Sequence, residues 1–494
     1  MSPAPLQFDV IVIGTGSGTK LVRPVAALGY KVAVIEKDAY GGTCLNRGCI
    51  PSKMLIHPAD IISTLKDEAP KFGIQLTASN QPLQTKMDQK ALIDHVCKEI
   101  DADSQSIPPM YDRTENLTRF SGSAEFIGER VVKVTQVVGK AETTYTITAP
   151  RVYIVTGCKA SVLDVPGLQG TPYMTYREIL RAPSTFESMI VIGGGYIACE
   201  LGYYAARVGN TEVTFLVREK MLRGEDEEIR AEFEKEFRSK FNVKIGVSPT
   251  ALAYENGEFH VTVVDKNGVK ETLIAKGLLV ATGVEPDTTP LHLETSGVKL
   301  DAKGFIKVNH KFETTCPGVY AFGDTIGRYL FKHSSNFEGE WLFNTQYAPE
   351  KNKEFIKKWV DSKTGGVLYP PMPHAVFSYP QIGGVGLTQE QAIEVYTKDG
   401  VIVGRADIAD VAMGAALRAT SGFTKLIFRK SDKQLVGAHM VGEQASVVIH
   451  MAIAYMNMNA TLYDMVDSIY IHPALVEVLR DACRDARGQF QKLG

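Results

Sequence analysis

The stretch Phe8-Asp9-Val10-Ile11-Val12-Ile13-Gly14-Thr15-Gly16-Ser17-Gly18-Thr19 decides the fold of the N-terminal part of the chain. Its short β-branched run is typical of a buried parallel strand, and the glycines after it predict a tight turn into a helix. A second strand is predicted over residues 31–36 and ends in Glu36. This unit predicts a dinucleotide site, because Gly14 and Gly16 let the backbone approach a pyrophosphate and Glu36 binds ribose hydroxyl groups.

One position departs from the usual dinucleotide pattern. Thr19 stands where the third small residue of the glycine-rich turn is normally found. A larger side chain there is expected to loosen the contact between helix and strand. The phosphate-binding turn itself stays intact, because the first two glycines are both present.

A second glycine-rich turn repeats the pattern after a predicted strand at residues 189–192. The strand after its helix, residues 212–217, ends in Arg218, with Arg223 shortly after. Cations in this place suit a coenzyme with a 2′-phosphate, whereas an acid would suit one with free ribose hydroxyls. The alternative is that both arginines are solvated surface charges, and Glu219 is the only acid nearby.

Composition places the chain among ordinary globular proteins. Its 494 residues correspond to roughly three domains of ~150 residues, with 44% hydrophobic and 22% charged residues. A net charge of −2 gives no electrostatic case for binding nucleic acid or an acidic membrane. The scattered cysteines, the lack of a long apolar run and an N-terminus without a signal peptide pattern predict a cytoplasmic protein.

The segment Gly41-Gly42-Thr43-Cys44-Leu45-Asn46-Arg47-Gly48-Cys49-Ile50-Pro51-Ser52-Lys53 carries the most specific chemistry. Pro51 favours a helix start here, and a thiolate at Cys49 would face the positive end of that helix, which lowers its pKa. So small a ring between Cys44 and Cys49 predicts a strained, redox-active disulfide. The alternatives are a structural bridge or half a zinc site, but no further ligands lie nearby, so no metal site is predicted.

The segment Tyr470-Ile471-His472-Pro473-Ala474-Leu475-Val476-Glu477 is the second catalytic candidate. Proline keeps the preceding His472 out of helical geometry, at the entrance of a helix. Glu477, in the first turns of that helix, can hold one ring nitrogen, and a carboxylate-held imidazole is a general acid–base. A lone histidine is more often structural, and that alternative stays open on these residues alone.

The cysteine segment resembles the active-site motif of the flavin-dependent pyridine nucleotide–disulfide oxidoreductases, and the resemblance covers nearly the whole chain. It implies an α/β protein with two Rossmann-like dinucleotide-binding domains, for FAD and NADPH, and a C-terminal α+β dimerisation domain. The expected domains are FAD binding at 1–157 and 284–365, NAD(P)H binding at 158–283, and the subunit interface at 366–494.

The resemblance also assigns residues to the two cofactors. Two strands end in Thr-Gly, at Thr156-Gly157 and Thr282-Gly283, where the family's chain crosses between its cofactor domains. The run Val319-Tyr320-Ala321-Phe322-Gly323-Asp324 resembles the family's second FAD motif, with Asp324 on the ribityl chain. The FAD residues implied are Gly14, Gly16, Glu36, Gly42, Thr43, Lys53, Thr156, Gly157 and Asp324. Those implied for NADPH are Gly193, Gly195, Tyr196, Ala198, Arg218, Arg223 and Gly283.

The catalytic roles implied by the resemblance form a relay. NADPH, or NADH as the other coenzyme, reduces FAD, and electrons then reach the Cys44–Cys49 disulfide. Cys49 is the thiol that contacts the flavin, and Cys44 attacks the substrate disulfide. His472, held by Glu477, protonates the leaving thiol. Lys53 is the lysine beside the flavin, Glu200 is its acid partner, and Tyr196 is the ring that covers the nicotinamide pocket.

Details of the motifs look most like mycothione reductase within this family. The function predicted is therefore NADPH-dependent reduction of a low-molecular-weight disulfide. The alternative is an NAD-linked dihydrolipoyl dehydrogenase, acting alone or as a subunit of a larger complex. The resemblance further implies a homodimer in which each subunit lends His472 to the other subunit's Cys44, a two-fold arrangement with equivalent sites.

Overall fold

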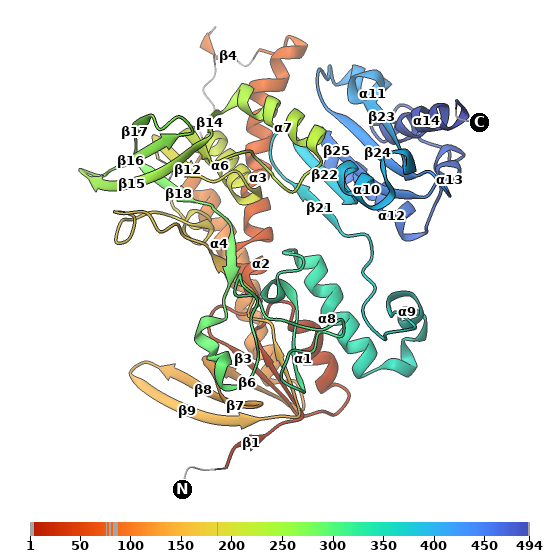
Figure 1. Cartoon of the computed structure of the whole chain (residues 1–494). Coiled ribbons are helices and arrows are strands. Elements are labelled where there is room, and N and C mark those ends of the chain that lie inside the picture. The colour runs from red at the N-terminus through yellow and green to blue at the C-terminus, as the bar shows by residue number, and fades with distance from the viewer. Residues whose placement is uncertain (1–3, 76, 79–80, 83–86, 185, 493–494) are drawn as a thin grey trace. The chain divides into compact units, whose positions relative to one another are not determined.

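The computed structural model describes residues 4–75, 77–78, 81–82, 87–184 and 186–492 (Figure 1). Its residues group into two compact units, and each is described by itself. Unit 1 comprises Met1–Ser52, Asp94–Ser161 and Val284–Tyr369. Unit 2 comprises Lys53–Ile93, Val162–Gly283 and Pro370–Gly494. The three-domain division expected from the sequence stays a prediction.

Unit 1 is built on a five-stranded parallel sheet with the order β20-β10-β2-β3-β6. Helix α1 (Thr19–Ala26) joins β2 to β3, as the glycine-rich stretch predicts. All four residues of β2 are buried, which is why its sequence is continuously apolar. The strands are β2 (Val10–Ile13), β3 (Val32–Glu36), β6 (Leu117–Ser121), β10 (Arg151–Ile154) and β20 (Val319–Ala321).

A second, mainly antiparallel sheet packs on the first within unit 1, in the order β1-β9-β8-β7. The core between the two sheets includes Ile11 and Phe120 of the first and Phe126 and Val132 of the second. The strands are β1 (Leu6–Gln7), β7 (Ser123–Gly128), β8 (Val131–Val138) and β9 (Ala141–Thr148), with a separate pair β11 (Cys158–Ala160) and β19 (Val284–Pro286). The helices are α2 (Gly42–Arg47), α8 (Lys332–Gln346), α9 (Lys353–Trp359) and most of α4 (Gln89–Asp112).

Close backbone approach explains the glycines of the first turn. Gly14 has φ +107°, and a Cβ there would lie 2.4 Å from the carbonyl oxygen of Val155. A Cβ on Gly18 would lie 2.2 Å from the carbonyl oxygen of Gly14. The close contact between helix and strand is therefore made at Gly18, while the Thr19 hydroxyl donates to the Gly16 carbonyl at 2.9 Å.

Unit 2 contains the second parallel sheet, in the order β14-β13-β12-β18. Helix α6 (Tyr196–Val208) joins β12 to β13, so the strand–helix–strand unit is repeated, and the two Rossmann-like folds of the prediction are confirmed. The strands of the parallel sheet are β12 (Ser188–Ile192), β13 (Glu212–Val217), β14 (Asn242–Ile245) and β18 (Gly277–Val280). An antiparallel sheet is formed by β15 (Val247–Glu255), β16 (Glu258–Asp265) and β17 (Lys270–Ala275), and a short pair by β4 (Thr77–Ala78) and β5 (Gln81–Pro82). Further helices are α3 (Cys49–Ser63, which begins in unit 1), α5 (Tyr176–Ile179) and α7 (Glu227–Lys240).

The C-terminal part of unit 2 is α+β, with an antiparallel sheet in the order β21-β22-β25-β24-β23. Buried residues of α12 and α14, such as Ile449 and Leu479, pack on sheet residues such as Leu426 and Ala438. The strands are β21 (Pro373–Val376), β22 (Gln381–Gly386), β23 (Val401–Asp407), β24 (Phe423–Arg429) and β25 (Leu435–Gly442); the helices are α10 (Gln389–Tyr396), α11 (Ala412–Ala416), α12 (Ala445–Asn457), α13 (Leu462–Val466) and α14 (Glu477–Gln491).

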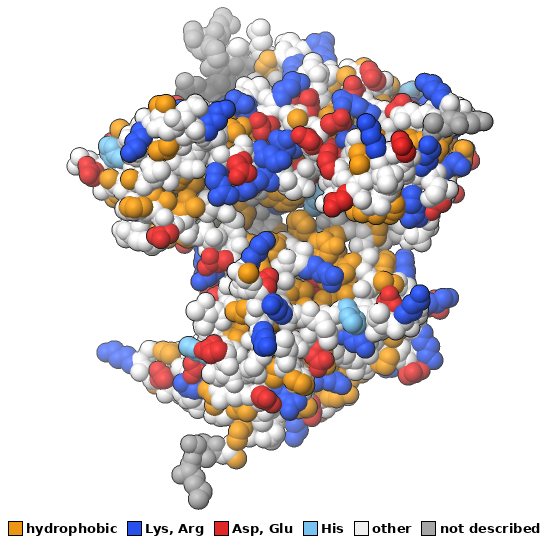
Figure 2. Space-filling model, viewed as in Figure 1, with side chains coloured by type: hydrophobic (Ala, Val, Ile, Leu, Met, Phe, Trp, Pro, Cys, Tyr) orange, Lys and Arg blue, Asp and Glu red, His pale blue; other side chains and the backbone are white. Residues whose placement is uncertain are grey.

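Charges of both signs are interspersed on the face shown in Figure 2, in keeping with a net charge of −2. Among the described residues, none of the helices combines the length and the apolar character that crossing a bilayer requires.

Candidate active site

The two cysteines of the redox motif lie at a helix junction in unit 1. Cys44 lies within α2, and Cys49 is the first residue of α3. Gly48 joins the two helices, and a Cβ there would lie 2.9 Å from the carbonyl oxygen of Thr43. The side chain of Cys44 is hydrogen-bonded to that of Cys49, and Cys49 is exposed. This hydrogen bond, followed by burial, raises the pKa of Cys44 above its ordinary value.

A half-buried lysine lies near this thiol pair, and the sequence motifs assign it no role. Lys332 begins α8, and its positive charge acts on both Cys44 and Cys49. Burial lowers the pKa of Lys332 from its ordinary value, and the two thiols oppose that shift. Its Nζ donates to the hydroxyl of Ser17 at 3.1 Å, which fixes the ammonium group beside the glycine-rich turn.

The first dinucleotide cradle is formed at the carboxyl ends of β2 and β3. A Cβ on Gly42 would lie 2.5 Å from the Cα of Gly16, so both glycines are needed for this approach. Glu36 Oε2 accepts from the backbone N–H of Thr15 at 2.9 Å and from its hydroxyl at 2.6 Å. With Thr43 directly after Gly42 in α2, this close backbone and fixed acid fit a pyrophosphate and a ribose.

The other predicted FAD residues of unit 1 lie at the ends of neighbouring strands. Thr156 and Gly157 follow β10, and the Thr156 hydroxyl lies 3.5 Å from that of Thr325. Asp324 follows β20 and accepts from Ser335 Oγ at 3.3 Å. Burial raises the pKa of Asp324, while the hydrogen bond from Ser335 and the charge of Lys332 oppose the shift. These residues fit the second half of a cofactor site along the same sheet edge.

The second cradle lies in unit 2, at the N-terminus of α6. Gly193 has φ +136°, and a Cβ there would lie 2.2 Å from the Ala281 carbonyl oxygen and 3.5 Å from the Cβ of Ala198. Gly195 is the residue before α6, and Tyr196 is its first residue. Gly283, with φ +116°, follows the end of β18 on the same sheet. As in unit 1, the glycine-rich turn leaves a backbone that a phosphate can approach closely.

Lys53 and Glu200 form the ion pair that the family resemblance predicts. Lys53 Nζ lies 2.6 Å from Glu200 Oε2, and Glu200 Oε1 accepts from the backbone N–H of Phe377 at 3.0 Å. Burial raises the pKa of Glu200, while Lys53 opposes the shift. Lys53 also lies 4.4 Å from the centre of the Phe377 ring, so its ammonium group is held on two sides.

His472 and Glu477 form the predicted acid–base pair in unit 2. His472 Nδ1 lies 3.0 Å and 3.1 Å from the two carboxylate oxygens of Glu477, the first residue of α14. The backbone N–H of Ala474, together with the bonds from His472 and Arg480, lowers the pKa of Glu477 to about 2. The carboxylate of Glu477 is 1% exposed while the imidazole of His472 is 67% exposed, so a buried carboxylate holds a ring that is open to solvent.

Two family models match the chain. A model described as "Pyridine nucleotide-disulphide oxidoreductase" matches residues 8–339, and the family's dimerisation domain matches residues 372–483. The chain belongs to this family. The predictions of family, fold class and enzyme class are thereby confirmed: the protein is a flavoprotein NAD(P)H-dependent disulfide oxidoreductase.

Similar proteins span more than one substrate. The chain is 29% identical to a dihydrolipoyl dehydrogenase of Corynebacterium glutamicum, covering 98% of each chain. It is 30% identical to a mycothione reductase of Mycobacterium tuberculosis, covering 96% of this chain and 98% of that protein. The solved structure of the HOCl-induced flavoprotein disulfide reductase RclA from Escherichia coli matches with a TM-score of 0.80 at 23% identity, covering 97% and 99% of the two chains, which supports the fold.

Members of this oxidoreductase family use FAD and a pyridine nucleotide. The prediction that NADPH is the preferred coenzyme of this chain depends on two arginines. The side chains of Arg218 and Arg223 are 65% and 55% exposed. Glu219 lies between them, with N–O distances of 3.9 Å to Arg218 and 3.6 Å to Arg223. Two arginines suit a 2′-phosphate and one acid suits ribose hydroxyls, so this local geometry accommodates either coenzyme.

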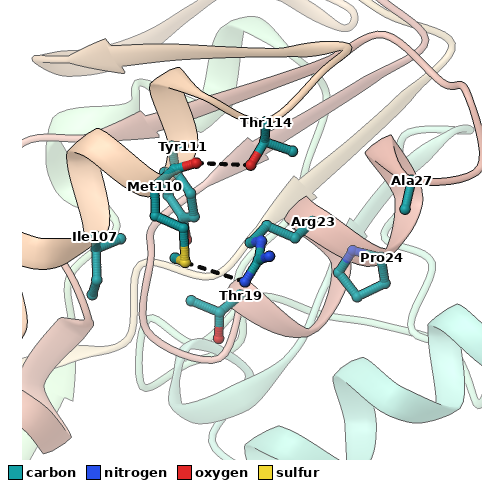
Figure 3. Close-up of a pocket in the computed structure, with 8 residues that line it drawn as sticks. All are labelled: Thr19, Arg23, Pro24, Ala27, Ile107, Met110, Tyr111 and Thr114. Atoms are coloured by element: carbon teal, nitrogen blue, oxygen red, sulfur yellow. Dashed lines mark hydrogen bonds between the residues drawn. The ribbon is translucent and has the colours of Figure 1, made fainter.

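A pocket of about 510 Å³ in unit 1 lies between α1 and α4 (Figure 3). In Figure 3, Arg23 reaches across it to the sulfur of Met110, at 3.1 Å, and Thr114 bonds the Met110 carbonyl at 2.8 Å. Thr19 lines one wall, so the unusual residue of the glycine-rich turn faces this pocket.

Proposed function

We propose that the protein reduces a low-molecular-weight disulfide with NADPH as the electron donor. The observation that carries the proposal is the pair Cys44 and Cys49, whose side chains are hydrogen-bonded to each other where α2 meets α3. Thiols placed in this way alternate between a dithiol and a small-ring disulfide. The mycothione reductase relative supports a small disulfide as the substrate.

The cysteines perform two exchange steps on the substrate. When bound, FAD supplies the transfer of a hydride equivalent from the coenzyme to the cysteine disulfide. The Cys44 thiolate then attacks the substrate disulfide, forming a mixed disulfide and releasing the first substrate thiol. Cys49 attacks the Cys44 sulfur, which re-forms the Cys44–Cys49 disulfide and releases the second thiol. One NADPH and one proton are consumed for two thiols formed.

We assign three basic residues to charge stabilisation, proton transfer and the flavin. Lys332 stabilises negative charge on the thiol pair, because its half-buried ammonium group acts on both sulfurs. His472, held by Glu477 through Nδ1, protonates the departing substrate thiol from its other ring nitrogen. We assign Lys53, paired with Glu200, to the flavin, and Tyr196 to the cover of the nicotinamide pocket.

We further propose a homodimer with a shared active site. The matched dimerisation domain supports a homodimer, and the exposed ring of His472 supports its use by a partner. Large apolar side chains are also exposed in this part of unit 2, as expected of a surface that another subunit covers. They are Val447, Met458, Tyr463, Ile469 and Ile471. The predicted cytoplasmic location completes the proposal, because reduced thiols persist there.

A second function is NAD-linked oxidation of a dihydrolipoyl group. Glu219 favours it, because an acid after this strand suits the ribose hydroxyls of NAD. The dihydrolipoyl dehydrogenase relative supports the same alternative. Steady-state rates with NADPH and NADH, measured on a panel of small disulfides and on lipoamide, separate the two. Turnover of lipoamide with NAD(H) alone would replace the first proposal with the second.

The roles of the cysteines are tested by one pair of variants. Cys44→Ser is expected to leave a thiolate at Cys49 beside the flavin and therefore a long-wavelength charge-transfer absorbance. Cys49→Ser is expected to lack this absorbance while retaining bound FAD. Absorbance spectra of both oxidised proteins decide the assignment, which fails if the band depends on Cys44 instead.

The shared site is tested by complementation. Cys44→Ser and His472→Ala homodimers are each expected to be nearly inactive. After unfolding and refolding together, hybrid dimers contain one site with both an intact Cys44 and an intact His472, so activity returns. Hybrids shown by affinity tags to have formed, yet still inactive, would place the base and the thiol in the same chain.

A further inference from the structure

Three side chains with metal-binding atoms meet in unit 2, outside the redox motif. They are Glu225, His374 and His439, and their ligand atoms all lie within 4.8 Å of one another. Glu225 lies just before α7, His374 in β21 and His439 in β25. The side chain of Glu225 is fully buried, that of His374 is 15% exposed, and His439 is buried. Two imidazoles and a carboxylate brought together below the surface form a donor set for a transition metal.

The register of the sheet explains why the two imidazoles face each other. Gly384 of β22 pairs with His374 on one side and with His439 on the other. Residues directly opposite in a sheet lie on the same face, so the two histidines flank the glycine on one face. A Cβ on Gly384 would lie 2.5 Å from His374 Nε2 and 2.9 Å from His439 Nδ1. The absence of a side chain at Gly384 therefore leaves both nitrogens facing the same point.

The hydrogen bonds of His439 leave one nitrogen as an unused acceptor. Its Nε2 lies 2.9 Å from the Leu387 carbonyl oxygen, which only accepts, so Nε2 carries the proton. In the neutral ring Nδ1 then has a lone pair, and this buried atom has no hydrogen-bond partner among the described residues. A metal-bound histidine commonly donates its other ring N–H to a backbone carbonyl, which is the arrangement here.

The carboxylate of Glu225 supplies negative charge to the same place. Its Oε2 lies 2.9 Å from His374 Nε2, and its Oε1 accepts from the hydroxyl of Tyr196. The neighbouring cation, Lys425, is already matched by Asp226 at 2.8 Å. The charge of Glu225 is therefore available to a cation, and a bond between Glu225 and His374 alone would leave the nitrogen of His439 unsatisfied.

We propose that Glu225, His374 and His439 bind a divalent transition-metal ion, with Zn²⁺ as the ion to test. In a tetrahedral zinc site, ligand atoms about 2.1 Å from the ion are about 3.4 Å apart, so the three groups close slightly around it. His374 Nε2 exchanges its bond to Glu225 for the metal, and His439 Nδ1 gains the partner it lacks. A fourth position remains for water or another ligand.

The experiment uses the full-length, flavin-loaded protein carrying Cys44→Ser and Cys49→Ser, so that the redox thiols do not compete for zinc. After treatment with a chelator, Zn²⁺ is titrated against a chromophoric competitor. We expect one Zn²⁺ per chain, and binding at least about 100-fold weaker in His374→Ala and in His439→Ala. The matched control is His292→Ala, whose ring lies 3.3 Å from Glu294 but is half exposed, and it should bind zinc as the parent does.

A second variant keeps the test decisive if either histidine variant fails to fold. Glu225→Gln preserves the shape of the side chain and an acceptor for Tyr196 but removes the charge. It should weaken zinc binding and abolish the visible absorbance of Co²⁺ bound in the same site. Absence of stoichiometric zinc binding in the parent, or equal binding by the parent and the ligand variants, would overturn the proposal.

Discussion

The two dinucleotide-binding regions share a backbone but differ in the side chains at the end of the second strand. In unit 1, β3 ends in Glu36, whose carboxylate is fixed by two bonds from Thr15. In unit 2, the residue after β13 is Arg218, which is exposed and loosely paired with Glu219. The first region thus presents a fixed acceptor, whereas the second presents exposed and loosely paired side chains. If FAD binds in unit 1 and the pyridine nucleotide in unit 2, as the family resemblance implies, the retained cofactor meets a preformed site and the exchanging coenzyme an adaptable one.

The largest expected effect comes from filling the two cradles. Gly14→Ala places a Cβ 2.4 Å from the Val155 carbonyl oxygen, and Gly193→Ala places one 2.2 Å from that of Ala281. We expect Gly14→Ala to be purified without FAD, and Gly193→Ala to retain FAD that NADPH no longer reduces. Flavin absorbance before and after NADPH addition measures both. Gly29→Ala is the control, because Gly29 has φ +91° but no atom within 4 Å of the added Cβ.

The next effect concerns the arginines of unit 2. Each charge-assisted contact to a 2′-phosphate contributes about 1.5–3 kcal/mol, so the double change Arg218→Ala and Arg223→Ala should raise the KM for NADPH at least about 100-fold. The KM for NADH should barely change, because that coenzyme lacks the phosphate. Steady-state kinetics with both coenzymes measure this. Equal changes in KM for the two coenzymes would show that the arginines are solvated surface charges.

A smaller effect is expected at the acid of unit 1. Glu36→Gln keeps the size of the side chain but removes its charge, which should weaken FAD binding about tenfold, or roughly 1.4 kcal/mol. Fluorescence titration of the flavin-free protein with FAD measures the change. The KM for NADPH should stay the same in the reloaded enzyme. An unaltered FAD affinity would show that Thr15 holds Glu36 for structural reasons alone.

The smallest effect is expected at Glu219, which competes with a 2′-phosphate for the two arginines. Exposed ion pairs contribute about 0.2–1 kcal/mol, so Glu219→Gln should free Arg218 and Arg223 and lower the KM for NADPH by up to about fivefold. The measurement is the ratio of kcat/KM for NADPH to that for NADH. A fall in NADH efficiency with no gain for NADPH would instead make Glu219 a ribose-binding acid and favour the dehydrogenase.

Local sequence motifs make much of the fold and of the candidate active site predictable. The glycine-rich turns, the strands beside them and the pairing of His472 with Glu477 all depend on residues close together in the chain. The pairing of Lys53 with Glu200 came from family resemblance, and the structure joins them at 2.6 Å. Lys332 was missed because only the packing of α8 brings it to the cysteines from far along the chain.

The histidine–glutamate cluster was also beyond sequence reasoning, which predicted no metal site. Its geometry depends on the register that places Gly384 between His374 and His439, and on the loop that carries Glu225 over them. No spacing within one segment signals such a set, because its members come from separate elements. The close packing of Gly18 was likewise hidden, since the motif directed attention to Thr19.

The exposed ring of His472 has a consequence for how the enzyme behaves in solution. If each subunit borrows this base from its partner, an isolated chain has thiols without an acid and an acid without thiols. Catalysis then requires association, so the rate per chain falls on dilution as dimers dissociate, by mass action rather than unfolding. The cell's supply of the protein would thus set both the number of active sites and the fraction of them that work.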